Sequence, residues 1–129
     1  SNVLLDIFTR DSNWYSWSIK ALSDNSSTSR LIINPIIYSE VSIGFNSVKD
    51  LDLVLNEIGL LNEPILAEVA FLAGKAFMRY RQKGGTKSSP LPDFFIGAHA
   101  SHAKYSLLTR DKHRFLNYFP QLQIIGPNN

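Results

Sequence analysis

The stretch SSPLPDFFIGAHA, residues 88–100, carries the clearest local signal for a loop followed by a helix, and the fold is predicted outward from it. Pro90 and Pro92 favour a loop and the apolar run favours a helix, so we predict a loop over residues 86–92 and a helix from Asp93. Asp93 has the N-cap role, in which a carboxylate accepts hydrogen bonds from the first backbone N–H groups. The same carboxylate would also suit a site that needs an anion, and the local pattern fits both interpretations.

On either side of this stretch, segments with helical spacing alternate with short apolar strands. Helices are predicted over residues 13–25, 35–44, 48–58 and 64–82, with an opening helix near the N-terminus. The predicted strands are LIIN (31–34), SLLT (106–109) and LQII (122–125). Helices that alternate with such strands predict an α/β fold with a mainly parallel sheet covered on both faces.

Composition is typical of an ordinary globular protein. The chain has 129 residues, 44% of them hydrophobic, which predicts a single domain over residues 1–129. It has no cysteine, which excludes disulfides and thiolate metal sites. No apolar run approaches the ~20 residues of a membrane span and no signal pattern is seen, so we expect a cytoplasmic protein without membrane contact. The net charge of +2 is too small to indicate nucleic-acid binding by itself.

Three acidic residues stand where the predicted strands end. Glu40 lies one turn into the helix after LIIN. Asp93 opens the helix that precedes SLLT, and Asp111 follows SLLT and Arg110. Functional groups gather beyond the carboxyl ends of parallel strands, so we expect these carboxylates to share a pocket. Like charges at close range need a cation, and hard oxygen ligands favour Mg²⁺ or Mn²⁺. Taken singly, the three residues also fit a solvated helix face, a helix cap and a turn.

Five segments in order carry a family resemblance: SNVLLDIF, INPIIYSEVS, LPDFFIGAHA, LLTRDKHRF and YFPQLQIIGP. With them the chain resembles the PIN-domain ribonucleases, specifically the VapC-like toxins of type II toxin–antitoxin systems, over essentially its whole length. The resemblance implies a three-layer α/β/α PIN-like domain and an endoribonuclease that uses Mg²⁺ or Mn²⁺. It makes Glu40, Asp93 and Asp111 the catalytic, metal-binding acids. It further implies an RNA substrate, a cognate antitoxin that inhibits the toxin, and a homodimer.

The family pattern contains one more acid, an aspartate immediately before the SNV step at the end of the first strand. The sequence begins at Ser1, so we expect an N-terminally incomplete domain whose first strand is missing. Asp6 lies further along the opening helix and is interpreted as structural. Ser1 and Asn2 would flank the missing acid and are candidates for orienting a metal-bound carboxylate. The missing acid also supports an alternative, a catalytically inactive PIN-fold module that binds proteins.

Further candidates lie beside the acids or on one helix face. Thr109, Arg110 and His113 are candidates for contact with a phosphate or a metal-bound water, although a strand threonine and a surface ion pair are equally ordinary explanations. Lys75, Arg79 and Lys83 recur at i, i+4 and i+8 on one helix face, and Arg81 and Lys87 add charge nearby. These basic residues are candidates for RNA-backbone contact, or simply favourable cations near a helix C-terminus. A DNA 5′-nuclease would need extra helical segments, and a small-molecule hydrolase would need a G-x-S-x-G elbow that this chain lacks.

Overall fold

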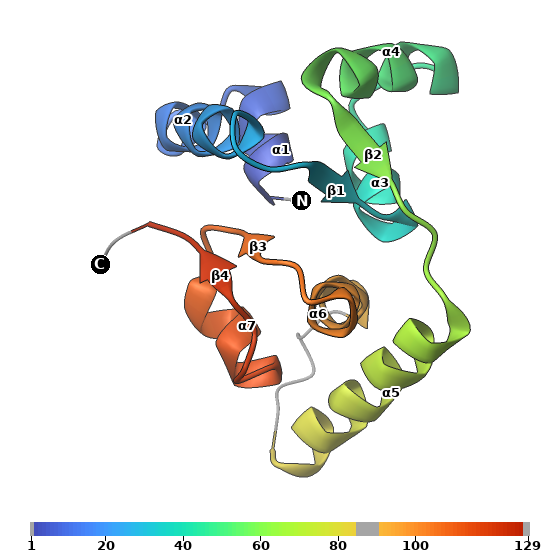
Figure 1. Ribbon diagram of the computed structural model, residues 1–129. Coiled ribbons are helices and arrows are strands. Elements are labelled where there is room, and N and C mark those ends of the chain that lie inside the picture. Colours follow the sequence, from blue (N-terminus) through green and yellow to red (C-terminus); the bar gives the residue numbers. More distant parts are fainter. Residues whose placement is uncertain (1, 85–90, 128–129) are drawn as a thin grey trace. The chain divides into compact units, whose positions relative to one another are not determined.

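Short parallel strands are interspersed with helices in the computed structural model, which describes residues 2–84 and 91–127 (Figure 1). Within these ranges there are seven helices and four strands. The predicted α/β fold with mainly parallel strands is therefore confirmed. The chain divides into two compact units, Ser1–Pro64 and Ile65–Asn129, and each is described by itself. The single domain over residues 1–129 stays a prediction. None of the helices in the described ranges has the length and apolar character needed to cross a membrane.

The first unit contains two parallel strands, and two helices connect the first strand to the second. Its elements are α1 (Asn2–Thr9), α2 (Tyr15–Ser26), β1 (Leu31–Ile33), α3 (Pro35–Ser42), α4 (Val48–Ile58) and β2 (Leu60–Asn62). Strand β1 runs parallel to β2, with Leu31 opposite Leu60. Sequence analysis did not predict β2, because a three-residue strand between a glycine and a proline is too short to show periodicity.

Local chemistry fixes the ends of α3 and α4. The Asn34 side chain accepts hydrogen bonds from the backbone N–H groups of Ile36 and Ile37, both at 3.0 Å, and Pro35 occupies the first turn. Ser47 caps α4 in the same way through Asp50 N–H at 3.1 Å. Gly59 ends α4 with a φ of 87°, a left-handed conformation that glycine adopts without strain. The Asn34 cap and Pro35 fix where α3 begins after β1, and with it the position of Glu40 along that helix.

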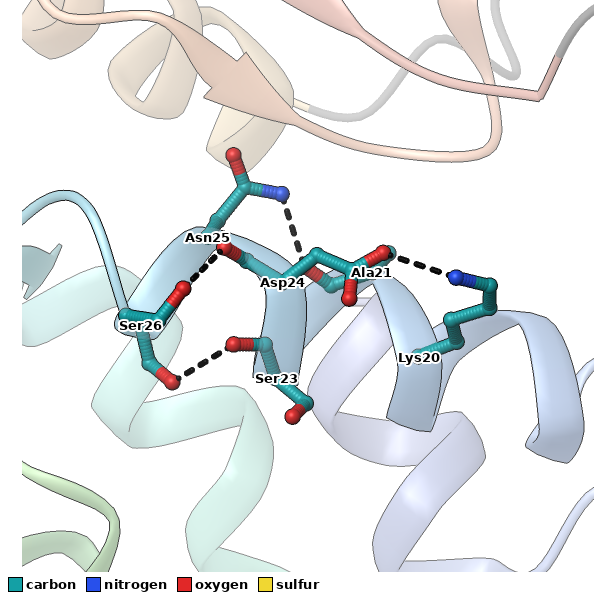
Figure 2. A network of polar contacts seen from close by, with 7 residues as sticks. Lys20, Ala21, Ser23, Asp24, Asn25 and Ser26 are labelled. Atoms are coloured by element: carbon teal, nitrogen blue, oxygen red, sulfur yellow. Dashed lines mark hydrogen bonds and ion pairs between the residues drawn. The ribbon is translucent and has the colours of Figure 1, made fainter.

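The C-terminal half of α2 is held by polar contacts within the helix itself (Figure 2). Lys20 Nζ lies 3.0 Å from Asp24 Oδ2, an i, i+4 ion pair between two exposed side chains. Asn25 Nδ2 donates to the Ala21 carbonyl at 2.7 Å, and Ser26 Oγ donates to the Ser23 carbonyl at 2.9 Å. All three contacts link residues three or four apart, so they require no ligand to explain them.

Asp6 is buried at the contact between α1 and α2. Its side chain is almost completely shielded, and its Oδ2 accepts a hydrogen bond from Ser18 Oγ at 2.9 Å. Ser18 is itself fully buried. A buried carboxylate that receives a side-chain hydrogen bond across a helix pair stabilises that pair. The interpretation of Asp6 as a structural residue is supported.

The second unit places a second parallel strand pair beside three helices. Its elements are α5 (Ala67–Gln82), α6 (Leu91–Ala103), β3 (Leu107–Leu108), α7 (Lys112–Tyr118) and β4 (Ile124–Ile125). Strand β3 runs parallel to β4, with Leu107 opposite Ile124. Helix α5 begins at Ala67 rather than at Pro64. Helix α7 was not predicted, because seven residues with few apolar positions give little periodicity.

Helix α6 begins earlier than the sequence predicted. It includes Leu91 and Pro92, so Asp93 lies in its first turn and is not its N-cap. The physical reason is that a first turn tolerates proline, since N–H groups there have no partner within the helix. The remainder of the predicted loop, residues 86–90, lies outside the described residues.

Aromatic side chains form the core of the second unit. Phe94 is fully buried and stacks on Tyr118 with ring centroids 4.2 Å apart. Phe77 meets the Phe94 ring edge-on at 5.3 Å, and Tyr80 meets Tyr118 at 5.0 Å. These contacts join α5, α6 and α7. Because Asp93 directly precedes Phe94, its backbone is anchored at the edge of this core.

Gly97 provides a stability prediction for this core. A Cβ atom at Gly97 would lie 2.5 Å from two ring atoms of Phe119, a ring that is 7% exposed. Gly97→Ala is therefore expected to lower the free energy of unfolding by about 1–2 kcal/mol, because the clash outweighs the better helix propensity of alanine. The measurement is equilibrium unfolding in urea.

The matched control is Gly74→Ala in α5, where a Cβ would meet nothing within 4 Å. This variant should gain about 0.5–1 kcal/mol, since only the propensity effect remains. Equal stability of the two variants would contradict the close packing of α6 against Phe119.

Candidate metal centre

Two of the three predicted acids meet one cationic side chain in the second unit. Arg114 Nη2 lies 2.8 Å from Asp111 Oδ2, and Arg114 Nε lies 3.5 Å from Asp93 Oδ2. The Asp93 side chain is 10% exposed, whereas that of Asp111 is 37% exposed. Asp93 and Asp111 are 18 positions apart in the sequence, and α6 and α7 bring their carboxylates within reach of a single guanidinium group.

The turn between β3 and α7 positions Asp111. Thr109 is buried, its N–H donates to the Ile125 carbonyl at 3.1 Å, and its Oγ1 accepts a hydrogen bond from Asp111 N–H at 3.1 Å. Asp111 stands directly before α7, yet its side chain makes no capping hydrogen bond to that helix. The carboxylate is instead directed toward Arg114. Thr109 thus acts on the backbone of Asp111.

Glu40 belongs to the first unit and lies in the second turn of α3. The neighbouring Ile37 and Val41 are buried. Its Oε1 atom is shielded from solvent and has no hydrogen-bond partner among the described residues. A buried carboxylate oxygen in this condition is costly unless a donor or a cation reaches it. Glu40 therefore stands between buried apolar residues along α3.

The donor chemistry of the three acids fits a hard divalent cation. All their side-chain donors are carboxylate oxygens, which suit Mg²⁺ or Mn²⁺ better than zinc. Asp93 and Asp111 share a cation in the form of Arg114, and the buried Oε1 of Glu40 meets no hydrogen-bond donor within residues 2–84 and 91–127. Within the described part of each unit, no three His, Asp or Glu side chains are grouped in a way that would hold a metal ion.

The remaining candidates occupy varied positions. Asn2 is half-buried at the start of α1, Arg110 is half-buried beside Asp111, and His113 is exposed in the first turn of α7. Ser1 and Lys87 lie outside the described residues.

The basic residues of α5 are exposed but do not all share one face. Lys75 and Arg79 are one turn apart, and Lys83 caps the C-terminal end of the helix. Lys75 Nζ lies 5.2 Å from the centroid of the Phe71 ring, and the Arg81 guanidinium lies 5.7 Å from that of Phe77. Arg81 is therefore directed to a different side of α5 from Lys75.

Arg114 is the residue that sequence analysis missed. An arginine three residues after an aspartate commonly pairs with it when both belong to one helical segment. Because α7 was not predicted, the spacing of Asp111 and Arg114 could not be interpreted as an ion pair. Contact between Arg114 and Asp93 was not accessible from local spacing at all.

Comparison with known proteins gives the family. Residues 1–118 match the model of the PIN domain, so the chain belongs to the PIN domain family. The fold is similar to that in the crystal structure of VapBC2 from Rickettsia felis bound to a DNA fragment from its promoter. That match has a TM-score of 0.69 and 18% sequence identity, and covers 97% of this chain and 93% of the other.

A second solved structure shows the same likeness. It is that of VapBC-1 from nontypeable Haemophilus influenzae, with a TM-score of 0.63, 18% identity, and coverage of 83% of this chain and 84% of the other. At this identity the likeness concerns the fold. No protein with a curated description matches the chain. The resemblance to the PIN domain family is confirmed, and the fold is similar to that of two VapBC structures.

Proposed function

We propose that this protein is a metal-dependent endoribonuclease toxin of the VapC type, inhibited by a cognate antitoxin. The observation that carries the proposal is the Asp93–Arg114–Asp111 cluster, which gathers two carboxylates in a chain of the PIN domain family. Carboxylate oxygens are the donors that Mg²⁺ and Mn²⁺ prefer, and one or two carboxylates commonly hold Mg²⁺ together with waters and substrate phosphates. The similar folds of two VapBC structures support the toxin class.

In this proposal Glu40, Asp93 and Asp111 hold Mg²⁺ or Mn²⁺. When bound, the metal supplies positive charge for the developing phosphate charge and a more acidic water. Thr109 keeps the Asp111 backbone in place through its hydrogen bond, so that the carboxylate does not turn back to cap α7. Ser1, Asn2, Arg110 and His113 are proposed to orient ligands or substrate around these acids.

RNA is the proposed substrate. The exposed lysine and arginine side chains of α5 are proposed to contact its phosphate backbone. Lys75 and Arg79 offer two cations one turn apart, and Arg81, Lys83 and Lys87 are the other candidates. Phosphate contacts of this kind release counterions, so binding should weaken as salt rises. Charge-removing variants are therefore expected to reduce the salt dependence of RNA binding.

The proposed partners and setting follow from the toxin class. We propose one domain over residues 1–129, a homodimer, and a cognate antitoxin bound to the toxin in the cytoplasm. The fold is similar to that in two VapBC structures, which supports an antitoxin as the partner.

One observation favours the alternative, a catalytically inactive PIN-fold interaction module. Arg114 already neutralises part of the charge of Asp93 and Asp111, as would be expected of a site that no longer binds metal. The two functions differ in one property, since only the nuclease requires a divalent cation for activity.

The deciding experiment is cleavage of a mixed single-stranded RNA pool by the purified protein, with 5 mM EDTA or with about millimolar Mn²⁺. We expect cleavage with Mn²⁺, loss of cleavage in EDTA, and recovery when excess Mn²⁺ is restored. A single-stranded DNA of the same sequence is the control for the sugar. Cleavage that persists in EDTA would overturn the metal-dependent mechanism, and absence of cleavage with Mn²⁺ would favour the interaction module.

A further inference from the structure

The contacts of Arg114 suggest a role beyond a surface ion pair. Its guanidinium group meets Asp111 Oδ2 at 2.8 Å and Asp93 Oδ2 at 3.5 Å through the nitrogens Nη2 and Nε. The same group lies 5.8 Å from the centroid of the Phe115 ring, and Phe115 is buried. An aromatic neighbour and two carboxylates together restrict where the guanidinium can lie.

The two carboxylates need a counter-charge wherever the chain exists without metal. Asp93 is largely buried against the aromatic core, where an ionised carboxylate without a cation is unfavourable. Asp111 adds a second negative charge on the same guanidinium. Arg114 supplies the positive charge from within the second unit. The two carboxylates therefore have a counter-charge even when no metal ion is bound.

A divalent cation and the guanidinium would compete for these oxygens. The atoms that Arg114 contacts are carboxylate oxygens of two proposed metal ligands, and a cation beside them would repel the positive charge of Arg114. The Arg114 side chain is 43% exposed, so it has a route into solvent. The cluster can therefore exchange one cation for the other without a change in α6 or α7.

We propose that Arg114 is a positioning residue that acts as a tethered counter-ion: it holds Asp93 and Asp111 in the metal-free protein and yields to the divalent cation. This inference rests on the proposed function, because it assumes that the two acids bind metal. Its consequence is that Arg114 sets the metal concentration at which the site fills. A site with a tethered competitor fills at higher metal concentration than the same site without one.

The test measures Mn²⁺ affinity by calorimetry and the melting temperature without metal, for the wild type and Arg114→Gln. We expect Arg114→Gln to bind Mn²⁺ about tenfold more tightly and to melt at a lower temperature without metal. Arg114→Lys keeps the charge and should bind Mn²⁺ nearly as the wild type does. Arg30→Gln, which removes an exposed arginine of the first unit, should match the wild type in both measurements.

A metal-free comparison tests the counter-ion role directly. In the background Asp93→Asn with Asp111→Asn, the melting difference caused by Arg114→Gln should disappear, because the charges it serves are gone. A difference of the same size in that background would overturn the inference.

The Mn²⁺ measurement separates the two hypotheses. Wild-type binding with unchanged or weaker affinity in Arg114→Gln would overturn the inference and leave the proposed function standing. Absence of Mn²⁺ binding in every variant would overturn the proposed function. It would also overturn the inferred competition between Arg114 and the divalent cation.

Discussion

Asp93→Asn is expected to lower Mn²⁺-dependent RNA cleavage by about 10³-fold, because the variant keeps the shape of the side chain and removes the charge that would hold the metal. Asp93 is the more buried acid of the pair that Arg114 bridges, so water is poorly placed to replace it. Asparagine retains an oxygen that can accept from Arg114, and Asp111 keeps its own contact at 2.8 Å. The fold should therefore survive the substitution.

Single-turnover cleavage of a defined RNA, with melting temperature recorded in parallel, measures this effect. The matched control is Asp24→Asn, which removes an exposed aspartate that forms a surface ion pair with Lys20. That variant should cleave as the wild type does. Cleavage by Asp93→Asn within a few-fold of the wild type would mean that Asp93 is not a metal ligand.

Glu40→Gln should produce a loss of similar size, about 10³-fold, for a related reason. Its buried Oε1 has no hydrogen-bond partner among the described residues, and such burial of a carboxylate oxygen is costly unless a donor or a cation reaches it. Glutamine removes that charge without changing the length of the side chain. The protein is therefore expected to remain folded or to become slightly more stable without metal.

The combination of lost activity and retained stability distinguishes a functional carboxylate from a structural one. Glu57→Gln, on the exposed side of α4, is the matched control and should alter neither property. The double variant of Glu40→Gln with Asp93→Asn should be no slower than either single variant, since groups that serve one metal lose their effect together. Additive losses would indicate that the two acids act at separate places.

The sequence predicted most elements because their end signals are local. Gly59 ends α4, and Pro35 stands in the first turn of α3 after β1, as the pattern indicated. Two elements escaped prediction because they are short: β2 has three residues and α7 has seven. The N-cap role predicted for Asp93 was wrong, since a proline in the first turn of α6 is not a helix stop.

The candidate site was predictable only in part. The positions of Asp93 and Asp111 after a loop and a strand indicated acids near strand ends, and the structure brings both to one guanidinium. The identity of that guanidinium was not predictable, because it depends on the packing of α7 beside α6. For Glu40, the structure shows one shielded carboxylate oxygen where the sequence pattern also fitted a solvated helix face, and its role as a metal ligand stays a prediction.

We propose that Glu40, Asp93 and Asp111 bind the same hard cation. Anomalous diffraction from crystals of the protein grown with Mn²⁺, recorded near the manganese absorption edge, tests it most directly. The account predicts one strong anomalous peak with oxygens of all three carboxylates around it, bound directly or through one water, and Arg114 turned away. A peak elsewhere, or three carboxylates that share no ion while Mn²⁺ is bound, would contradict it.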